Sequence, residues 1–460
     1  MIRDFAARIP NADVQILDHY LHSLDPFSAD LAGDSFVSDV CVISTTPSYL
    51  FWRCPPTSLS LVRSYIKLIR QHCSSTTIIL VGPHGTAEPE STLRLTGADF
   101  AYRGELESGL VDAIVGLKAS SNHRYLASKG QKNFIAPEQP FKEMPLIYPS
   151  ESIACSEAHT WAPSMKLALF KDSGRYAMLE TSRGCSFNCD YCFRSGFRRS
   201  LRLKPILTIR QEVERITQLG VSYVFLIDET FGLPKSHVKD VLEIFKFYNL
   251  KFGLQTRPDI WTKREIDNLV YAGCLYVELG TESLSEEGIG VLSKFRDVSH
   301  VLELTNYFRL RVPYVGVNVI DVGNPDLNLL SRSLAKLELD NEGKHPPAFI
   351  PYPNTPWGDR ALLAAKATRS WDDVAALYGV YALMARHGFI AALLRRVALA
   401  RYVARILLRA LSAIPIPKAF FRTRFERHHH ADLYALQASK VDPAGLYPLS
   451  SDSPGANEYE

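Results

Sequence analysis

The stretch Arg183-Gly184-Cys185-Ser186-Phe187-Asn188-Cys189-Asp190-Tyr191-Cys192-Phe193 places three cysteines close together, with an aromatic residue directly before the last one. Three thiolates on one loop can bind three irons of an iron-sulfur cube and leave the fourth iron without a protein ligand, because no fourth cysteine follows nearby. A structural zinc ion favours four ligands in two separated pairs, and a disulfide framework favours an even, dispersed set. The spacing therefore predicts a 4Fe-4S cluster with one open iron.

This cysteine spacing, directly after a predicted strand, resembles the signature of the radical S-adenosylmethionine (SAM) superfamily. The resemblance implies a partial α/β barrel with Cys185, Cys189 and Cys192 as cluster ligands. It also implies that SAM chelates the open iron and is cleaved to a 5′-deoxyadenosyl radical by an electron from the cluster, which a donor such as flavodoxin or ferredoxin supplies. The protein's part in such chemistry is to position and shield the cofactors.

The composition is that of a globular protein, with 460 residues of which 46% are hydrophobic, enough for more than one core. The first residues, 1–14, include Arg3, Asp4 and Arg8 and lack the apolar core of a secretory signal. Eight cysteines without an export signal indicate a reducing compartment, so a cytoplasmic location is expected. The five cysteines outside the loop are interpreted as buried or inert thiols.

The segment 386–427 is strongly basic, with ten Lys or Arg against the single acid Glu426. Arg401, Arg405 and Arg409 recur at helical spacing, and apolar residues occupy much of the rest. The arginines argue against a membrane-spanning helix, which leaves a helix packed on the barrel, the favoured interpretation, or one on an anionic membrane surface. We expect residues 361–460 to form a helical C-terminal extension, and no nucleic-acid partner.

The first part of the chain alternates strand-like and helical patterns, which predicts an α/β domain with a doubly wound, Rossmann-like sheet over residues 1–118. The expected strands are Val14 to Leu17, Val40 to Ser44, Ile78 to Val81 and Asp99 to Tyr102. The expected helices are Leu59 to His72 and Ser108 to Leu117. Residues 119–171 lack sustained periodicity and are predicted to be a linker.

Residues 172–360 are predicted to form a partial (β/α)6 barrel, with functional residues at the carboxyl ends of its strands. The expected strands are Ala177 to Thr181, Tyr223 to Ile227, Phe252 to Thr256, Tyr276 to Leu279, Tyr314 to Ile320 and Ala348 to Ile350. The expected helices are Thr208 to Leu219, Lys235 to Phe247 and Lys263 to Ala272.

The ends of these predicted strands resemble the SAM-binding motifs of the superfamily, and their order along the chain matches it. The resemblance implies that a set of residues at these ends helps to hold SAM: Tyr191, Asp228, Glu229, Arg257, Glu282, Ser283 and Gly323. Two departures are the aspartate at 326, after the proline of the Gly323 turn, and Asn354, where the family has glycine. Asparagine tolerates a positive φ angle better than most residues, so the second departure is mild.

The N-terminal part resembles the cobalamin-binding domain that precedes many radical SAM barrels. The resemblance implies that cobalamin lies beside Thr45, the turn with Gly82 and His84, and the turn with Gly104 and Glu105. The alternative is a degenerate Rossmann-like domain that only packs on the barrel. The motif that supplies a lower axial histidine is absent, and the strand at Val14 to Leu17 matches the family's second strand, so we expect a further strand before Met1.

Together these resemblances imply a cobalamin-dependent radical SAM enzyme. The commonest implied reaction is methylation of an unactivated carbon in a small-molecule or natural-product substrate, with a cobalamin-carried methyl group as donor. One alternative is a cobalamin-assisted radical cyclase or oxidase of the tetrapyrrole type. Another is a non-catalytic iron-sulfur sensor or scaffold, which has no need of Glu282 or of a corrin domain.

Overall fold

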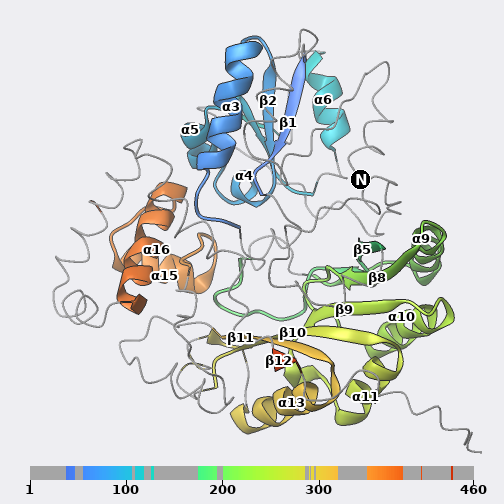
Figure 1. Cartoon of the computed structure of the whole chain (residues 1–460). Helices are drawn as coiled ribbons and strands as arrows, with labels where there is room; N and C mark the ends of the chain where they lie inside the picture. Colours follow the sequence, from blue (N-terminus) through green and yellow to red (C-terminus); the bar gives the residue numbers. More distant parts are fainter. Residues whose placement is uncertain are drawn as a thin grey trace, which may run out of the picture.

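The computed structural model describes the parts of the chain that form two α/β sheets and the segments between them. These parts are residues 38–46, 55–105, 109–118, 126–128, 175–193, 200–284, 288, 290, 292–294, 297–319, 350–386, 406 and 437–438. Figure 1 shows the N-terminal sheet above the barrel sheet, with the helices of the later part of the chain beside the junction.

The N-terminal sheet has four described strands in the order β1-β2-β3-β4. They are β1 (Val40–Ser44), β2 (Thr77–Val81), β3 (Phe100–Tyr102) and β4 (Leu126–Ser128). The first three are parallel, and β4 pairs with β3 in the antiparallel direction. The helices of this domain are α3 (Ser60–His72), α4 (Pro83–Ala87), α5 (Pro89–Thr96) and α6 (Leu110–Lys118).

Both faces of this sheet are covered, because alternate residues of β2 pack on different helices. Ile78 and Leu80 belong to the core with α3 and α5, whereas Ile79 and Val81 pack with α6. The predicted strands at 40–44, 78–81 and 99–102 and the two predicted helices are confirmed within two residues. The sequence interpretation missed β4, which falls in the expected linker. The strand expected at Val14 to Leu17 lies outside the described residues.

The second sheet has the order β12-β11-β10-β9-β8-β5. Its strands are β5 (Arg175–Leu179), β8 (Val221–Leu226), β9 (Lys251–Thr256), β10 (Cys274–Glu282), β11 (Tyr314–Val319) and β12 (Gln437–Ala438). Five strands of this sheet, β5, β8, β9, β10 and β11, are parallel to their neighbours, which is the arrangement of a partial barrel. A short hairpin, β6 (Ser182–Arg183) with β7 (Arg202–Leu203), follows β5.

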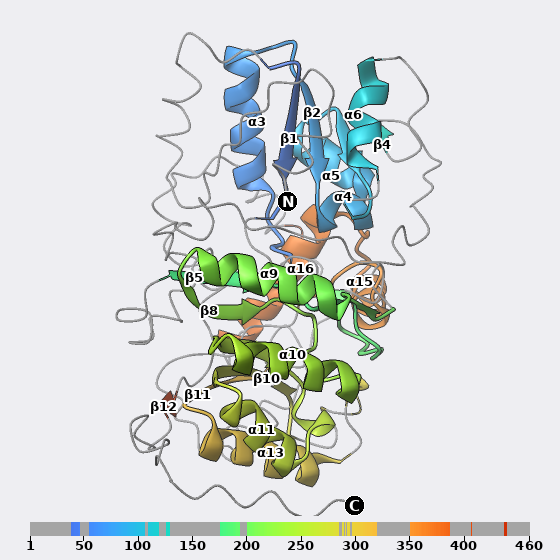
Figure 2. The same ribbon diagram turned by 90° about the vertical axis from the view of Figure 1, so that its right-hand side faces the viewer.

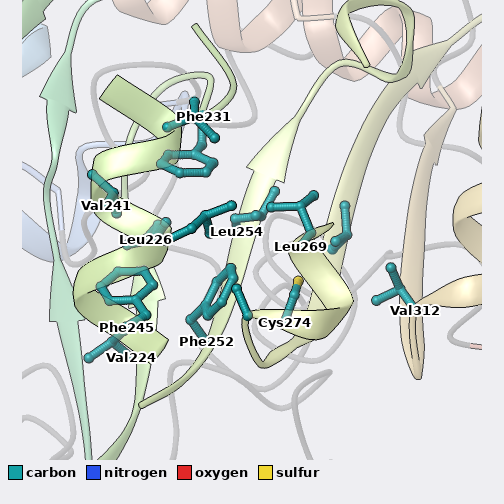
Figure 3. Close-up of a cluster of buried hydrophobic side chains, with 14 of the residues drawn as sticks. Val224, Leu226, Phe231, Val241, Phe245, Phe252, Leu254, Leu269, Cys274 and Val312 are labelled. Carbon is teal, nitrogen blue, oxygen red and sulfur yellow. The ribbon is translucent and has the colours of Figure 1, made fainter. Parts of the chain in front are cut away.

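The outer face of this sheet carries the main hydrophobic core. Val224, Leu226, Phe252 and Leu254 alternate along β8 and β9 and pack against the helices (Figure 3). These helices are α9 (Ile206–Gln218), α10 (Lys235–Phe247), α11 (Lys263–Tyr271) and α13 (Val298–Arg311), with the 3-10 helix η5 (Pro258–Ile260) between β9 and α11. Helix α11 begins with a capping box, in which Thr262 accepts from the Glu265 amide and the Glu265 side chain accepts from the Thr262 amide.

The inner face is built from the other residues of the same strands. A Cβ atom added to Gly253 would meet Tyr223, Phe225 and Tyr276, so these rings fill the barrel interior at that level. Further toward the carboxyl ends the inner residues become polar, as at Glu278, whose carboxylate accepts from the Asn318 side chain at 2.8 Å. The site therefore lies where the interior changes from aromatic to polar.

Five of the six predicted barrel strands are confirmed. Of the sixth, Ala348 to Ile350, only Ile350 is described, and it is not in a strand. The place beside β11 is taken by the antiparallel β12, from the far end of the chain. The later part of the chain contains the helices α15 (Pro356–Ala364) and α16 (Trp371–Arg386), which lie beside the junction of the two sheets and at its height (Figures 1 and 2).

Trp371 of α16 is fully buried in one core cluster with residues of α3, α5 and β2. The same cluster includes Phe193, directly after the last cysteine of the loop, and Tyr352. The start of the expected C-terminal extension therefore packs against the N-terminal domain. Among the described residues, no helix combines the length and apolar character needed to cross a bilayer. The basic segment 387–427 lies outside the described residues except for Ile406.

Candidate active site

The cysteine loop follows the barrel strand β5 and the short hairpin strand β6, and it lies at the carboxyl ends of the parallel strands. Cys185 and Cys189 are each 8% exposed, Cys192 is half-buried, and none of these three described residues forms a disulfide. The Cys192 amide donates to the Cys189 carbonyl at 3.1 Å, which forms a turn between these two residues. Two of the three thiols are thus sheltered from solvent on one short segment.

The carboxylates that follow β8 anchor the start of this loop. Asp228 is fully buried and accepts from the Thr181 amide at 2.8 Å and from the hydroxyls of Thr181 and Ser182 at 2.6 and 2.5 Å. Glu229 accepts from the Gly184 amide at 2.8 Å. The sequence interpretation offered both carboxylates to SAM. These bonds join Asp228 to one amide and two hydroxyls of residues 181 and 182, and Glu229 to the amide of Gly184.

Burial raises the pKa of Asp228 to about 7, although the hydrogen bonds from Ser182 and Thr181 oppose this shift. The carboxylate is therefore costly to keep charged and is held by three donors of the segment that leads to Cys185. Its contribution is to fix the path of that segment.

Arg257, after β9, lies directly against the cysteine loop. Its guanidinium is 3.8 Å from the centre of the Phe187 ring, and Nη1 is 3.6 Å from the sulfur of Cys189. A bidentate pair with Asp259, at 2.7 and 3.0 Å, and a bond from Nη2 to the Lys294 carbonyl at 2.6 Å fix its orientation. An arginine held in this way stabilises negative charge on the sulfur of Cys189.

Glu282, at the end of β10, is joined to Tyr191 by a lysine that the sequence interpretation did not single out. The Lys294 ammonium donates to Glu282 Oε1 at 2.8 Å and to the Tyr191 hydroxyl at 3.0 Å, and that hydroxyl donates to the same Glu282 oxygen at 3.1 Å. A Cβ atom on Gly280 would come within 2.8 Å of the Lys294 ammonium, so a larger residue there would displace the lysine from its present position. Glu282 itself has a φ angle of 59°, which is strained for a residue with a side chain.

These charges act on the cysteines. Burial raises the pKa of the Cys189 thiol, and the cations Lys294 and Arg257 oppose that shift. The hydroxyl of Thr230 lies 3.4 Å from the sulfur of Cys185. Burial also raises the pKa of the Tyr191 hydroxyl, with the Glu282 carboxylate adding to the shift, so Tyr191 stays protonated. The environment combines three thiols with two cations and a hydroxyl, which suits an anionic cluster bound by thiolates.

Across the described residues, no group of three His, Cys, Asp or Glu side chains is arranged to share a single metal ion. A cube offers a different iron to each thiolate, so its ligands need not meet at one point. The donor set of three cysteines in one loop therefore fits a cluster.

In the N-terminal domain, the predicted cobalamin residues meet at the carboxyl edge of the sheet. Gly82 has a φ angle of 117°, and a Cβ atom there would come within 2.8 Å of the Thr45 hydroxyl. His84 is fully buried; Nδ1 lies 3.0 Å from the same hydroxyl, and Nε2 lies 2.6 Å from the Pro56 carbonyl. Because a carbonyl only accepts, Nε2 carries the hydrogen and Nδ1 accepts from Thr45.

The His84 ring also packs on Trp371, with ring centres 4.5 Å apart. Both of its nitrogens are therefore occupied by the protein, and the side chain does not present an axial ligand to a cobalt ion. The absence of a side chain at Gly82 allows the turn after β2 to approach Thr45, which follows β1.

The second predicted turn, Gly104-Glu105, is tied to the first one and to the barrel. The Gly104 amide donates to the Thr86 hydroxyl at 3.1 Å. The Glu105 carboxylate is 2% exposed and is taken up by Arg202 and Arg183 of the β6/β7 hairpin. Thr45, Gly82, His84 and Gly104 are thus brought together at one edge, whereas Glu105 reaches across to the other domain.

Two residues complete the predicted set. Ser283 is 4% exposed, and its amide donates to the Thr281 carbonyl at 2.7 Å directly after Glu282. Gly323 lies outside the described residues. Asn354 has a φ angle of 63°, in agreement with the expectation that asparagine replaces a glycine of positive φ there. Lys294 lies twelve residues beyond Glu282, in no motif, so only the fold could reveal it.

The buried His84 predicts a pH dependence of stability. Burial lowers its pKa from the ordinary 6.5 to about 4, so at pH 5 the ring stays neutral in the folded protein but takes up a second proton in the unfolded chain. Stability is therefore lost as the pH falls from about 7, by about 2 kcal/mol at pH 5 from this group. Urea titrations of wild type and His84→Gln at both pH values should show that the variant is less stable at pH 7 and loses about 2 kcal/mol less on acidification. Equal losses in the two proteins would contradict this assignment.

Comparisons with known proteins agree with this geometry. Residues 179–328 match the model of the radical SAM superfamily. The chain is 26% identical over 237 residues to the anaerobic magnesium-protoporphyrin IX monomethyl ester cyclase of Rubrivivax gelatinosus, covering 47% of this chain and 40% of that one. It is 25% identical over 290 residues to an uncharacterized methyltransferase of Pyrococcus horikoshii, covering 61% and 60%. The matches thus span about half the length of these relatives.

Among solved structures, the chain is similar to the radical SAM methyltransferase TsrM of Kitasatospora setae with cobalamin and a [4Fe-4S] cluster bound. The TM-score is 0.57 at 15% identity, with 79% of this chain and 74% of that chain covered. At this identity the likeness establishes the fold. Residues 179–328 thus match the radical SAM superfamily in sequence, and the chain shares the fold of this cobalamin-bound methyltransferase, with an α/β domain before the barrel.

Proposed function

We propose that this protein is a cobalamin-dependent radical SAM methyltransferase that methylates an unactivated carbon of a small molecule. The observation that carries the proposal is the arrangement around the cysteine loop: Cys185, Cys189 and Cys192 share one segment, and the cations Arg257 and Lys294 lie beside it. The fold of the N-terminal domain supports a corrin at the edge that faces the barrel.

In this proposal the three cysteines hold a 4Fe-4S cluster, which supplies the electron for reductive cleavage of SAM, while cobalamin carries a methyl group. The positive charge of Arg257, which contacts Cys189, offsets the negative charge of the thiolates on the loop. Asp228 and Glu229 hold the chain that enters the loop, through Thr181 and Gly184.

The methionine part of SAM is zwitterionic and needs groups of both signs. Glu282 offers a carboxylate to its ammonium group, and Lys294 and Arg257 offer positive charge to its carboxylate. The Tyr191 hydroxyl is hydrogen-bonded to both Glu282 and Lys294, and it holds these two side chains next to each other. Ser283 and Gly323 are assigned to the nucleoside part of SAM on their motif positions alone.

For cobalamin, the proposal uses the backbone at Thr45, Gly82 and Gly104 rather than a protein ligand to the metal. His84 is turned into the core and bonded at both nitrogens, so the lower face of the corrin receives no imidazole from it. An external electron donor such as flavodoxin or ferredoxin supplies the reducing equivalent.

A second candidate function is radical cyclisation or oxidation of a tetrapyrrole. The observation that favours it is the similarity to the anaerobic magnesium-protoporphyrin IX monomethyl ester cyclase over 47% of this chain. The cysteine loop, Arg257 and Glu282 would serve the same reductive cleavage in that reaction. The two candidates differ in whether the methyl group of SAM leaves it by polar displacement.

The test is reconstitution of the full chain with iron, sulfide and hydroxocobalamin, followed by SAM and dithionite. The proposal predicts 5′-deoxyadenosine by liquid chromatography and about one cobalamin retained per chain after gel filtration. Absence of 5′-deoxyadenosine would leave a non-catalytic iron-sulfur protein as the better description. Its formation without retained cobalamin would reduce the proposal to a radical SAM enzyme with a Rossmann-like packing domain.

A further inference from the structure

The two domains are joined by a buried group of four charged side chains beside the cysteine loop. Arg202 binds the Glu105 carboxylate through two bonds, Nη1 to Oε2 at 2.8 Å and Nη2 to Oε1 at 2.6 Å. Arg183 lies 3.2 Å from the same carboxylate through Nη1. It also binds Glu180 through two bonds, at 2.9 and 2.7 Å. The group is neutral, with two acids and two arginines.

The position of the arginines explains why this acid is needed. In the antiparallel β6/β7 hairpin, Arg183 is the direct partner of Arg202. Like charges directly opposite on neighbouring strands repel each other, and more strongly where water is excluded. Glu105 is 2% exposed and is within bonding distance of both guanidinium groups, so it offsets that repulsion.

Glu105 belongs to the other domain, in the turn that follows β3. The Tyr102 hydroxyl at the end of β3 donates to the Glu105 carbonyl at 3.2 Å, and the amide of Gly104 is held by Thr86. The carboxylate is therefore rigidly attached to the edge where the corrin is proposed to lie. On the barrel side, Arg183 is two residues before Cys185.

We propose that Glu105 is a positioning residue that fixes the cobalamin-type domain against the hairpin leading to the cluster loop. The proposal rests on the proposed function and refines it: the Glu105 bridge sets the distance between the corrin edge and the SAM site. Polar transfer of a methyl group from SAM to cobalamin requires that distance to be short. Reductive cleavage of SAM requires only the cluster and the barrel.

The loop keeps other anchors when the bridge is broken. Gly184 remains bonded to Glu229, and Cys189 remains against Arg257. Loss of the Glu105 charge should therefore lower methyl transfer to cobalamin but not reductive cleavage of SAM. General destabilisation of the protein would lower both activities together.

The test compares Glu105→Gln, Arg202→Gln and the double variant with wild type. Each protein is loaded with cluster and hydroxocobalamin, reduced with dithionite, and given SAM with a trideuterated methyl group. We expect transfer of the label to the cobalamin fraction to fall at least about tenfold in each variant, with 5′-deoxyadenosine within about twofold of wild type. The double variant should be no worse than the worse single one, because both remove the same interaction. The matched control is Asp372→Asn, which breaks another ion pair between the N-terminal domain and a later helix, Arg94 with Asp372 at 2.7 Å. It should behave as wild type.

Hydrogen exchange of the cofactor-free proteins gives a readout that needs no activity. Peptides that cover 182–184 and 202–204 should exchange at least about tenfold faster in Glu105→Gln and Arg202→Gln, and unchanged in Asp372→Asn. If wild type transfers no label, the proposed function fails while hydrogen exchange still tests the bridge. Equal exchange in all proteins, or equal loss of label and 5′-deoxyadenosine, would overturn the positioning role. Should one single variant fail to fold, the other decides the question.

Discussion

Alanine in place of any one of Cys185, Cys189 or Cys192 is expected to abolish both the brown colour of the reconstituted protein and SAM cleavage. A cube held by two thiolates loses affinity, and its exposed second iron changes the reduction potential. Two of these thiols are buried, so water does not easily replace the missing ligand. The effect is measured by three readouts: the iron content, the visible absorbance of the cluster, and the yield of 5′-deoxyadenosine.

The matched control is Cys274→Ala. Cys274 is 1% exposed and belongs to the outer core of the barrel, where burial raises its pKa and keeps the thiol protonated. Its loss should lower the free energy of unfolding by about 1 kcal/mol and leave iron content unchanged. Full iron content and activity in a single variant of the cysteine triad would show that the cluster is bound elsewhere.

Arg257→Met and Glu282→Gln should each lower SAM cleavage by about a hundredfold, the cost of losing a buried charge contact of about 3 kcal/mol. Removal of Arg257 leaves Asp259 without its bidentate partner and removes the cation next to Cys189. Removal of the Glu282 charge leaves the Lys294 ammonium, which is 5% exposed, without its carboxylate. Because one SAM pocket is proposed to serve both uses of SAM, S-adenosylhomocysteine and 5′-deoxyadenosine should fall together.

The comparison variant is Glu303→Gln, which breaks the exposed pair of Glu303 with Lys263 on the outer helices. Exposed pairs contribute little, so its yields of both products should match those of wild type. A selective loss of only one product in Arg257→Met or Glu282→Gln would mean that two separate SAM pockets exist.

The sequence predicts most of the fold, because the barrel strands alternate outer apolar residues with inner ones that grow polar toward their carboxyl ends. Val224, Leu226 and Leu254 show this alternation directly. The features of the fold that the sequence does not predict depend on contacts between segments that are distant along the chain. The antiparallel β12 has only two residues, too few for a periodic signal, and pairs with β11 from more than a hundred residues away. Trp371 likewise packs into the core of the N-terminal domain, with residues that are far from it in the sequence, and no local pattern predicts such a contact.

The candidate site divides in the same way. The cysteines, Arg257 and Glu282 follow strands that the pattern locates, so their meeting at one edge is a consequence of parallel topology. Lys294 could not be found, because its ammonium reaches back to Glu282 from a segment that carries no motif. His84 and Glu105 were expected to contact a corrin, but burial gave both side chains protein partners that a motif cannot reveal.

The methyltransferase assignment depends most directly on whether the methyl group of SAM reaches protein-bound cobalamin. The fully loaded protein is incubated with reductant and SAM that carries a trideuterated methyl group, and the cobalamin fraction is isolated under dim light for mass spectrometry. A cobalamin-dependent methyltransferase should give a trideuteromethyl label on the cobalamin, an equal amount of S-adenosylhomocysteine, and 5′-deoxyadenosine in the same reaction. If 5′-deoxyadenosine forms while the cobalamin stays unlabelled and no S-adenosylhomocysteine appears, the methyltransferase assignment is contradicted and a radical cyclase or oxidase describes the protein better.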